Sequence, residues 1–380
     1  MTGPLRLYGD ERHRILGWAA PPGLPKRSLL VTFEHGRRNM DGFRPARYPR
    51  VAERLGMQVL SVQTARCDWY ISDRTTDLSI ALARLTADFD DVTLIGFSMG
   101  AYAALLFSRV AHARRAILVS PQFSISPDAA PFDPKRHAIH DRLDVPMPEP
   151  QEWGNTALNG ALLYDPRHAV DAAHAARILA QFRNLLPCPL PHGGHPATRV
   201  LTEAGSVGSV VEAILTHHET LPSILAHHRR ARRGSLHYWL NLRRSMSPAR
   251  AAKLLDAARD LARTDHAPIT QRALALAILL EAKERGTTNL IARAILDHPE
   301  LSESDARLLR AALIRAQQRK TARHPKKPRG SEKGDLAARF VQFPSERPIM
   351  GPHEFREKGE MHFGRIDVGQ RFRPLIEPHP

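Results

Sequence analysis

The chain has 380 residues, of which 42% are hydrophobic and 6% aromatic, so it is long enough for one or two domains with a substantial core. Its formal net charge is +16, with 24 Lys and Arg against 20 Asp and Glu in residues 1–205 and 31 against 19 beyond. Cys67 and Cys188 lack the spacing of a zinc site or redox dithiol, the N-terminal segment has no apolar signal-peptide core, and no stretch has the length of a membrane span. We therefore expect a cytoplasmic protein with reduced thiols.

The first half of the chain alternates strand-like and helix-like segments. Two short apolar runs on either side of Asp10–Arg12 predict an N-terminal hairpin. After it, apolar runs predict strands and helically spaced apolar residues predict helices, in the order strand 28–33, helix 46–56, strand 57–64, helix 77–87, strand 91–97, helix 98–111 and strand 114–122. This alternation predicts a mostly parallel sheet with helices on both faces.

Residues 121–158 interrupt this alternation. They are rich in Pro and Asp and too irregular for a sheet element, and a loop of this length in a compact domain is usually a lid or a binding loop. The alternation then resumes with a strand at 159–164, a helix at 168–183 and a strand at 184–191.

The character of the chain changes after residue 205. Helical patterns follow one another without strand signals, and one of them begins with Ser247 as N-cap and Pro248 at the first helical position. We therefore expect a separate helical module over residues 206–318. Residues 319–380 are basic and rich in Pro and Gly at their start, and we expect a largely disordered tail there.

The sequence Gly-Phe-Ser-Met-Gly places Ser98 between the strand at 91–97 and the helix that follows. A nucleophilic serine on a strained turn requires this strand–serine–helix arrangement, with small residues around it. Gly96, Gly100 and Ala101 supply the small residues. Ser98 is therefore the candidate nucleophile, and the amide of Met99, at the helix N-terminus, is a candidate donor to an oxyanion.

A serine needs a base, and the expected chain order is serine, acid, histidine. The sequence "LPHGGHPATRV" offers His195, after the glycine pair, as the base, with His192 as the alternative. Asp165 directly follows the strand at 159–164 and is the favoured acid, with Asp171 as the alternative. The acid would hold the imidazole in its reactive tautomer.

The motifs "GFSMG", "YDP" and "GGH", each at an expected strand end, resemble the α/β-hydrolase family over about residues 3–205, and "GFSMGAYAALLF" and "ILVSPQ" are similar to a bacterial branch whose members often carry further helical domains. The resemblance implies a catalytic α/β-hydrolase-like domain over 1–205, in which 121–158 serves as a minimal lid. It also implies a second oxyanion donor in "TFEHG": alignment by the strand end favours the Glu34 amide, and alignment by His-Gly favours that of Arg37.

Trp69 and Tyr70, after the strand at 57–64, are candidates for lining the substrate pocket, or for packing their own loop. The favoured function is a serine hydrolase that cleaves a small-molecule carboxylic ester or thioester through an acyl-enzyme. The alternative is a non-catalytic interaction or ligand-binding protein that binds a protein partner through its helical module. We expect no metal, because the paired histidines at 217–218 and 227–228 lack the carboxylates or cysteines of a metal site, and no cofactor, because no phosphate-loop or dinucleotide-binding motif occurs. We expect no nucleic acid partner, because a basic tail of this kind is usually a solvated segment.

Overall fold

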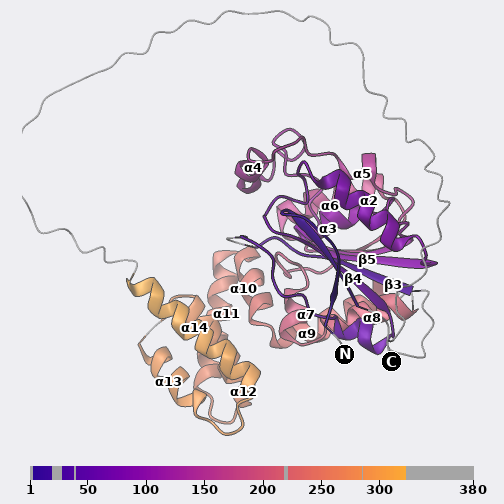
Figure 1. Cartoon of the computed structure of the whole chain (residues 1–380). Helices are drawn as coiled ribbons and strands as arrows, with labels where there is room; N and C mark the ends of the chain where they lie inside the picture. Colours follow the sequence, from indigo (N-terminus) through magenta and orange to yellow (C-terminus); the bar gives the residue numbers. More distant parts are fainter. Residues whose placement is uncertain (1–2, 19–27, 38–39, 218–220, 285, 322–380) are drawn as a thin grey trace, which may run out of the picture. The chain divides into compact units, whose positions relative to one another are not determined.

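The computed structural model describes residues 3–18, 28–37, 40–217, 221–284 and 286–321 (Figure 1). Eight strands form one sheet: β1 Leu5–Gly9, β2 His13–Trp18, β3 Ser28–Phe33, β4 Gln58–Thr64, β5 Asp91–Phe97, β6 Arg115–Val119, β7 Asn159–Tyr164 and β8 Leu185–Pro189. Their order is β1-β2-β4-β3-β5-β6-β7-β8, in which β2 is antiparallel to both neighbours and all other pairs are parallel. The predicted mostly parallel sheet and N-terminal hairpin are confirmed, and the strand order is that of the α/β-hydrolase fold.

Helices cover both faces of this sheet (Figure 1). On one face, α2 Thr75–Thr86, α3 Met99–Leu106 and α6 Ala169–Gln181 contribute to one apolar core. On the other, α1 Arg50–Arg54, α7 Arg199–Glu203, α8 Val207–His217 and α9 Leu221–Ala231 contribute to a second core. Strand β5 lies between β3 and β6 near the middle of the sheet, so the turn that follows it is held from both sides.

The irregular segment between β6 and β7 contains two short helices, α4 Pro134–His140 and α5 Pro150–Trp153, and no strand among its residues, all of which are described. It is tied to the body of the domain by a hydrogen bond of 2.7 Å from the Tyr102 hydroxyl to the Pro148 carbonyl and by an ion pair between Arg12 and Asp144. The segment that connects β6 to β7 is therefore fixed to the domain at α3 and at the turn before β2.

The chain beyond residue 205 first completes the sheet domain. Apolar side chains of α8 and α9, among them Val210 and Ile224, belong to the same core as the sheet, so the domain boundary expected after residue 205 falls inside this core. A third, all-helical core begins with Leu236. It is built by α10 Leu236–Ser245, α11 Pro248–Arg263, α12 Ile269–Glu281, α13 Thr287–Leu296 and α14 Glu303–Thr321.

The partly buried Trp239 of α10 packs against both the sheet core and the helical core. Of the predicted tail, residues 322–380 lie outside the described residues, and residues 319–321 form the end of α14. None of the helices in the described ranges is long and apolar enough to cross a membrane.

Candidate active site

The turn between β5 and α3 holds Ser98 in a conformation that few residues adopt. Its φ is 52° and its ψ is −119°, which is strained for a residue with a side chain. The two glycines are required by close backbone approach: a Cβ on Gly96 would lie 2.2 Å from the Gly100 carbonyl oxygen, and one on Gly100 would lie 2.5 Å from that of Phe33. The predicted strand–serine–helix turn is therefore present, with the tight packing that its glycines provide.

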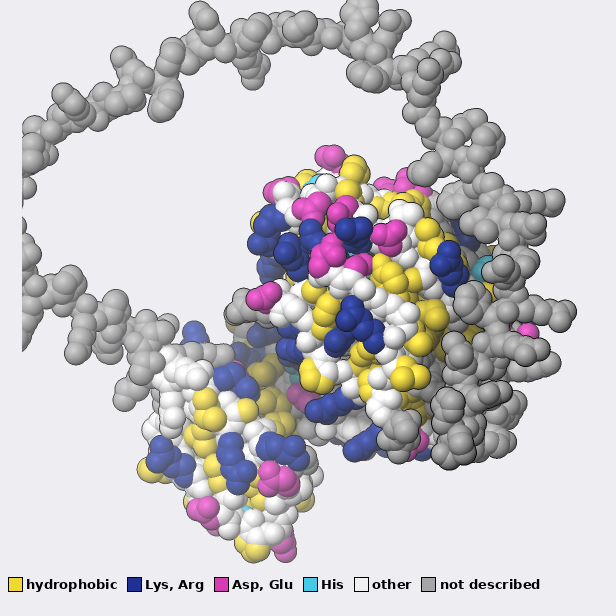
Figure 2. All heavy atoms as spheres, viewed as in Figure 1, with side chains coloured by type: hydrophobic (Ala, Val, Ile, Leu, Met, Phe, Trp, Pro, Cys, Tyr) yellow, Lys and Arg dark blue, Asp and Glu magenta, His cyan; other side chains and the backbone are white. Residues whose placement is uncertain are grey.

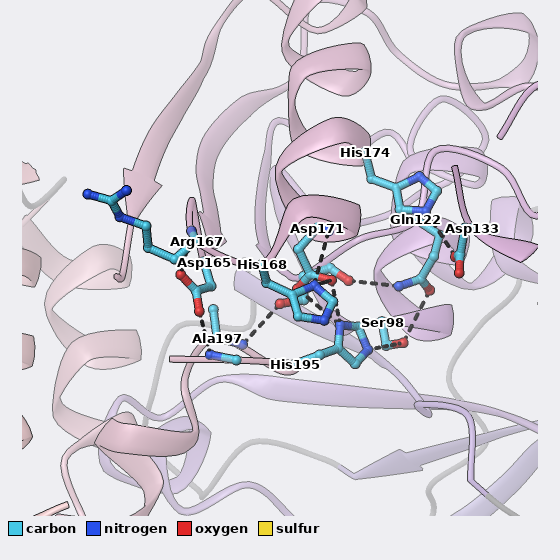
Figure 3. A network of polar contacts seen from close by, with 12 residues as sticks. Ser98, Gln122, Asp133, Asp165, Arg167, His168, Asp171, His174, His195 and Ala197 are labelled. Atoms are coloured by element: carbon cyan, nitrogen blue, oxygen red, sulfur yellow. Dashed lines mark hydrogen bonds and ion pairs between the residues drawn. The ribbon is translucent and has the colours of Figure 1, made fainter. Parts of the chain in front are cut away.

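His195 lies between Ser98 and a carboxylate (Figure 3). Its Nε2 is 2.9 Å from Ser98 Oγ, and its Nδ1 is 2.9 and 3.0 Å from the two carboxylate oxygens of Asp171. An ionised carboxylate only accepts hydrogen bonds, so Nδ1 carries the proton and Nε2 presents its lone pair to the serine hydroxyl. The three side chains form one hydrogen-bonded chain whose tautomer suits proton transfer from Ser98.

Asp171 occupies the first turn of α6 and is 2% exposed. Burial alone would raise its pKa, but hydrogen bonds from His168, His195 and Ser120 outweigh burial and hold the pKa well below its usual value. His168 Nδ1 lies 3.0 Å from Asp171 Oδ1, and this contact raises the pKa of His168. The acid is thus ionised at neutral pH and shared by two imidazoles.

Asp165, the acid favoured from the sequence, does not contact His195. Its carboxylate accepts three backbone N–H groups, from Arg167 at 2.8 Å, His192 at 3.0 Å and Gly194 at 2.8 Å. All of its hydrogen bonds therefore hold the turn after β7 and the loop after β8. The structure places the alternative, Asp171, against the imidazole instead, because α6 begins directly after that turn and directs its first turn toward the loop.

His192, the alternative base, faces away from Ser98. Its ring packs edge-on against Tyr238 at 5.5 Å, and its Nδ1 lies 3.5 Å from the Ser245 hydroxyl, both on α10. The loop that carries His195, residues 190–198, is held from the same side. Asn241 Nδ2 donates to the His192 carbonyl at 3.1 Å, and His228 Nε2 lies 3.0 Å from the Pro191 carbonyl. Helices α9 and α10 therefore support the loop that carries His195.

The three amides predicted as oxyanion donors differ in whether they are already hydrogen-bonded. The Met99 N–H is the first of α3 and has no acceptor within the helix, so it remains a candidate donor. The Glu34 N–H, by contrast, donates to the Val62 carbonyl at 3.0 Å and is not available to an oxyanion. The Arg37 amide hydrogen-bonds the Cys67 thiol. A Cβ on Gly36 would lie 3.5 Å from Met99 Cβ, so this loop passes beside the start of α3.

The two aromatic candidates for the substrate pocket lie in the core. Tyr70 is fully buried, and its hydroxyl lies 3.0 Å from the Glu34 carbonyl and 3.1 Å from that of Val62. Trp69 is 3% exposed and belongs to the same core cluster. Both residues have positive φ, 53° for Trp69 and 61° for Tyr70, which indicates a tight turn. Tyr70 therefore braces the loop after β3, and the structure favours packing of their own loop over an open pocket wall.

Sequence reasoning missed Gln122, which follows β6. Ser98 Oγ lies 3.1 Å from Gln122 Oε1, and Gln122 Nε2 donates to the Ser120 carbonyl at 3.0 Å, which fixes the orientation of the amide. The hydroxyl proton of Ser98 can thus be directed either to His195 or to Gln122. The sequence "ILVSPQ" contained this residue, but no periodicity identifies a side chain that turns back toward a neighbouring strand end.

A second acid–histidine pair was also missed. His174 on α6 and Asp133 before α4 are joined at 3.2 Å, and Arg136 of α4 binds the same carboxylate oxygen at 2.5 Å. The irregular composition of residues 121–158 gave no signal for this cluster. Over the described residues, no group of three or more His, Cys, Asp and Glu side chains is arranged to hold a metal ion.

No protein-family model and no curated protein matches the sequence. Similar solved structures include Est1E from Butyrivibrio proteoclasticus (TM-score 0.38, 13% identity, 56% of this chain and 99% of that chain) and an α/β serine hydrolase without lid from Xanthomonas campestris (0.35, 16%, 57% and 92%). Another is the capsule O-acetyltransferase of Neisseria meningitidis serogroup A (0.37, 13%, 54% and 93%). By its own strand order and the turn at Ser98, the chain has the α/β-hydrolase fold.

Proposed function

We propose that the protein is a serine hydrolase that cleaves a carboxylic ester or thioester of a small molecule through an acyl-enzyme. The observation that supports this most strongly is the hydrogen-bonded chain from Ser98 Oγ through His195 to Asp171, at 2.9 Å on both sides of the imidazole. A serine at the end of a central strand with an oriented base is the arrangement that activates a hydroxyl for attack on an acyl carbon.

The reaction follows from this geometry. Ser98 Oγ attacks the acyl carbonyl carbon while His195 Nε2 takes the hydroxyl proton, and the carbonyl oxygen becomes an oxyanion. His195 then gives the proton to the leaving alcohol or thiol as the acyl–oxygen or acyl–sulfur bond breaks. Water, deprotonated by the same nitrogen, then attacks the acyl-enzyme, and His195 returns this proton to Ser98 Oγ as the acyl–Oγ bond breaks and the carboxylic acid leaves. Asp171 stays ionised and stabilises the imidazolium in both halves of the reaction.

The Met99 amide would stabilise the oxyanion. It lies at the N-terminus of α3, where the unsatisfied N–H groups carry partial positive charge. The second donor would be the amide of His35 or Gly36, since this loop passes beside Met99, the Glu34 amide is paired with Val62 and the Arg37 amide with the Cys67 thiol.

The experiment that tests the function compares wild type with Ser98→Ala, using hydrolysis of short-chain acyl esters and thioesters and covalent labelling by a fluorophosphonate. Ser98→Ala should lower kcat by at least about 10³-fold and abolish labelling. Ser209→Ala, an exposed serine of α8, is the matched control and should retain both. A folded Ser98→Ala protein that still hydrolyses the esters at the wild-type rate would contradict the proposal. Labelling of another serine would show that Ser98 is not the nucleophile.

A further inference from the structure

Helix α4 brings a guanidinium group to the candidate site. Arg136 Nη2 lies 3.5 Å from His195 Nε2, the nitrogen that faces Ser98. The Arg136 side chain is 20% exposed, so it is reachable from solvent but largely enclosed. Figure 2 shows Lys and Arg side chains gathered beside acidic ones on the part of the surface around α4. One cation of this segment therefore lies at the reacting atoms and not on the outer surface.

A buried anchor holds Arg136 in this position. Asp133, 1% exposed, accepts from Arg136 Nη1 at 2.5 Å and from His174 Nε2 at 3.2 Å. His174 is fully buried, and its Nδ1 accepts the Phe123 N–H at 3.1 Å, which leaves the proton on Nε2 for Asp133. The anchor uses one arm of the guanidinium and leaves the other directed at His195.

This placement hinders the proposed reaction as long as nothing binds Arg136. His195 Nε2 has one lone pair, and both the Ser98 hydroxyl at 2.9 Å and the Arg136 guanidinium at 3.5 Å approach it as donors. When Nε2 takes the serine proton, the resulting imidazolium lies beside a second cation, and like charges at this distance repel. An anion bound to Arg136 would draw the guanidinium away from the lone pair and neutralise its charge.

We propose that Arg136 binds a carboxylate or similar anionic oxygen group carried by the leaving-group side of the substrate, so that the natural substrate is an anionic ester or thioester. The inference rests on the proposed function. Because His195 Nε2 returns its proton to the leaving oxygen or sulfur, that atom must lie next to Nε2, and Arg136 Nη2 is 3.5 Å from the same nitrogen. The anion is therefore attached within a few bonds of the leaving atom, while the carbonyl oxygen points toward the Met99 amide.

Three unactivated esters separate the possibilities. Acetoxyacetate carries a carboxylate one carbon from the leaving oxygen, isobutyl acetate is its uncharged isostere, and monoethyl malonate carries the carboxylate on the acyl side. Wild type should show a higher kcat/KM for acetoxyacetate than for either of the others. In Arg136→Gln the ratio of acetoxyacetate to isobutyl acetate should fall about 10- to 100-fold, the cost of losing a charged hydrogen bond.

Lys135→Gln is the matched control, because it removes one positive charge from the neighbouring, exposed position of α4 and should leave the ratio unchanged. Arg136→Gln leaves the Asp133 carboxylate with His174 alone, so the double variant Asp133→Asn/Arg136→Gln is measured beside it, with thermal unfolding of each. The double variant should show the same fall in ratio with a recovered unfolding temperature.

A wild-type preference that survives in folded Arg136→Gln, or an equal preference for monoethyl malonate, would overturn the anion site while leaving ester hydrolysis intact. If no ester is turned over, calorimetry of acetoxyacetate with Ser98→Ala, with and without Arg136→Gln, still decides. Binding that depends on Arg136 supports the site, and equal or absent binding in both overturns it. If wild type binds acetoxyacetate but turns over none of the esters, the proposed hydrolase function is contradicted instead.

Discussion

Replacing Asp171 by Asn is the sharpest test of which acid supports His195. Both carboxylate oxygens of Asp171 lie within 3.0 Å of His195 Nδ1. An amide in the same place offers one oxygen and one NH₂, and the NH₂ would favour the imidazole tautomer that carries its proton on Nε2. That tautomer has no lone pair for the serine hydroxyl. Loss of the correct tautomer and of the charge that stabilises the imidazolium lowers turnover by about 10³- to 10⁴-fold in sites of this kind.

Asp165→Asn is the matched comparison, since it makes the same chemical change in an equally buried carboxylate. Oδ1 of Asp165 accepts from Arg167 and His192, and Oδ2 accepts from Gly194. The amide can keep the first two bonds, but its NH₂ would face the Gly194 N–H as a second donor. We expect a loss of about 1–3 kcal/mol in the free energy of unfolding, and a smaller loss of turnover than in Asp171→Asn.

The assay combines kcat/KM for a short-chain ester at neutral pH with urea unfolding of each variant. Both variants should lose stability, since the hydrogen bonds that hold down the pKa of Asp171 also stabilise the folded state, but Asp171→Asn should lose far more turnover than Asp165→Asn. If Asp165→Asn abolished turnover while a folded Asp171→Asn remained near the wild-type rate, the assignment of the acid from the hydrogen-bond geometry would be wrong.

Two further variants test the parts of the fold that surround the site. His13 is fully buried, and neither of its ring nitrogens has a partner among the described residues; burial lowers its pKa to about 4. The unfolded chain takes up this proton near pH 6.5 and the folded chain does not, so stability decreases as pH falls from about 6.5 to 4, by about 3 kcal/mol for this group. His13→Phe should reduce that decrease in urea unfolding at pH 7 and 5, and an unchanged pH dependence would contradict the expected uptake. Asn241→Ala removes the hydrogen bond to the His192 carbonyl and should lower kcat several-fold, because the loop that carries His195 loosens. The control Asn184→Ala loses a similar bond, to the Ala157 carbonyl, and should leave kcat unchanged. Equal effects of the two variants on kcat would argue against support of the loop by α10.

The sequence predicted the sheet and the position of Ser98 well, because both depend on local pattern. Apolar runs fixed the strand that became β5 at the observed residues, 91–97, and the glycines around Ser98 reported a close backbone approach that the structure shows at Gly96 and Gly100. The helix expected at 46–56 is shorter, Arg50–Arg54, since Pro49 restricts the residue before it and the chain is extended there.

The choice between Asp165 and Asp171 could not be made from local pattern. Both follow β7 within seven residues, and a strand-end rule selects the nearer one. What decides is how the first turn of α6 and the loop after β8 are oriented, and this depends on tertiary packing. The same holds for the Glu34 amide, whose pairing with Val62 is a contact between two strand ends.

The boundary after residue 205 was placed where the composition changes, but composition reports mainly the solvent-facing side of a helix. The core-facing side of α8 continues the sheet core through Val210 and Ile214. The contacts of His228 and Asn241 with the loop that carries His195 show the same: helices beyond the expected boundary help to position His195.

Helix α6 links the two functions proposed for this site. Asp171 and His174 are three residues apart and lie on one face of the helix. Asp171 orients the imidazole of His195, and His174 holds the Asp133 carboxylate that anchors Arg136. A displacement of α6 would therefore move the base and the guanidinium together. Turnover and selectivity for an anionic leaving group should for this reason decline in parallel in variants that disturb the packing of α6, such as at the fully buried Ile178, and separately in variants of Asp171 and Arg136 themselves.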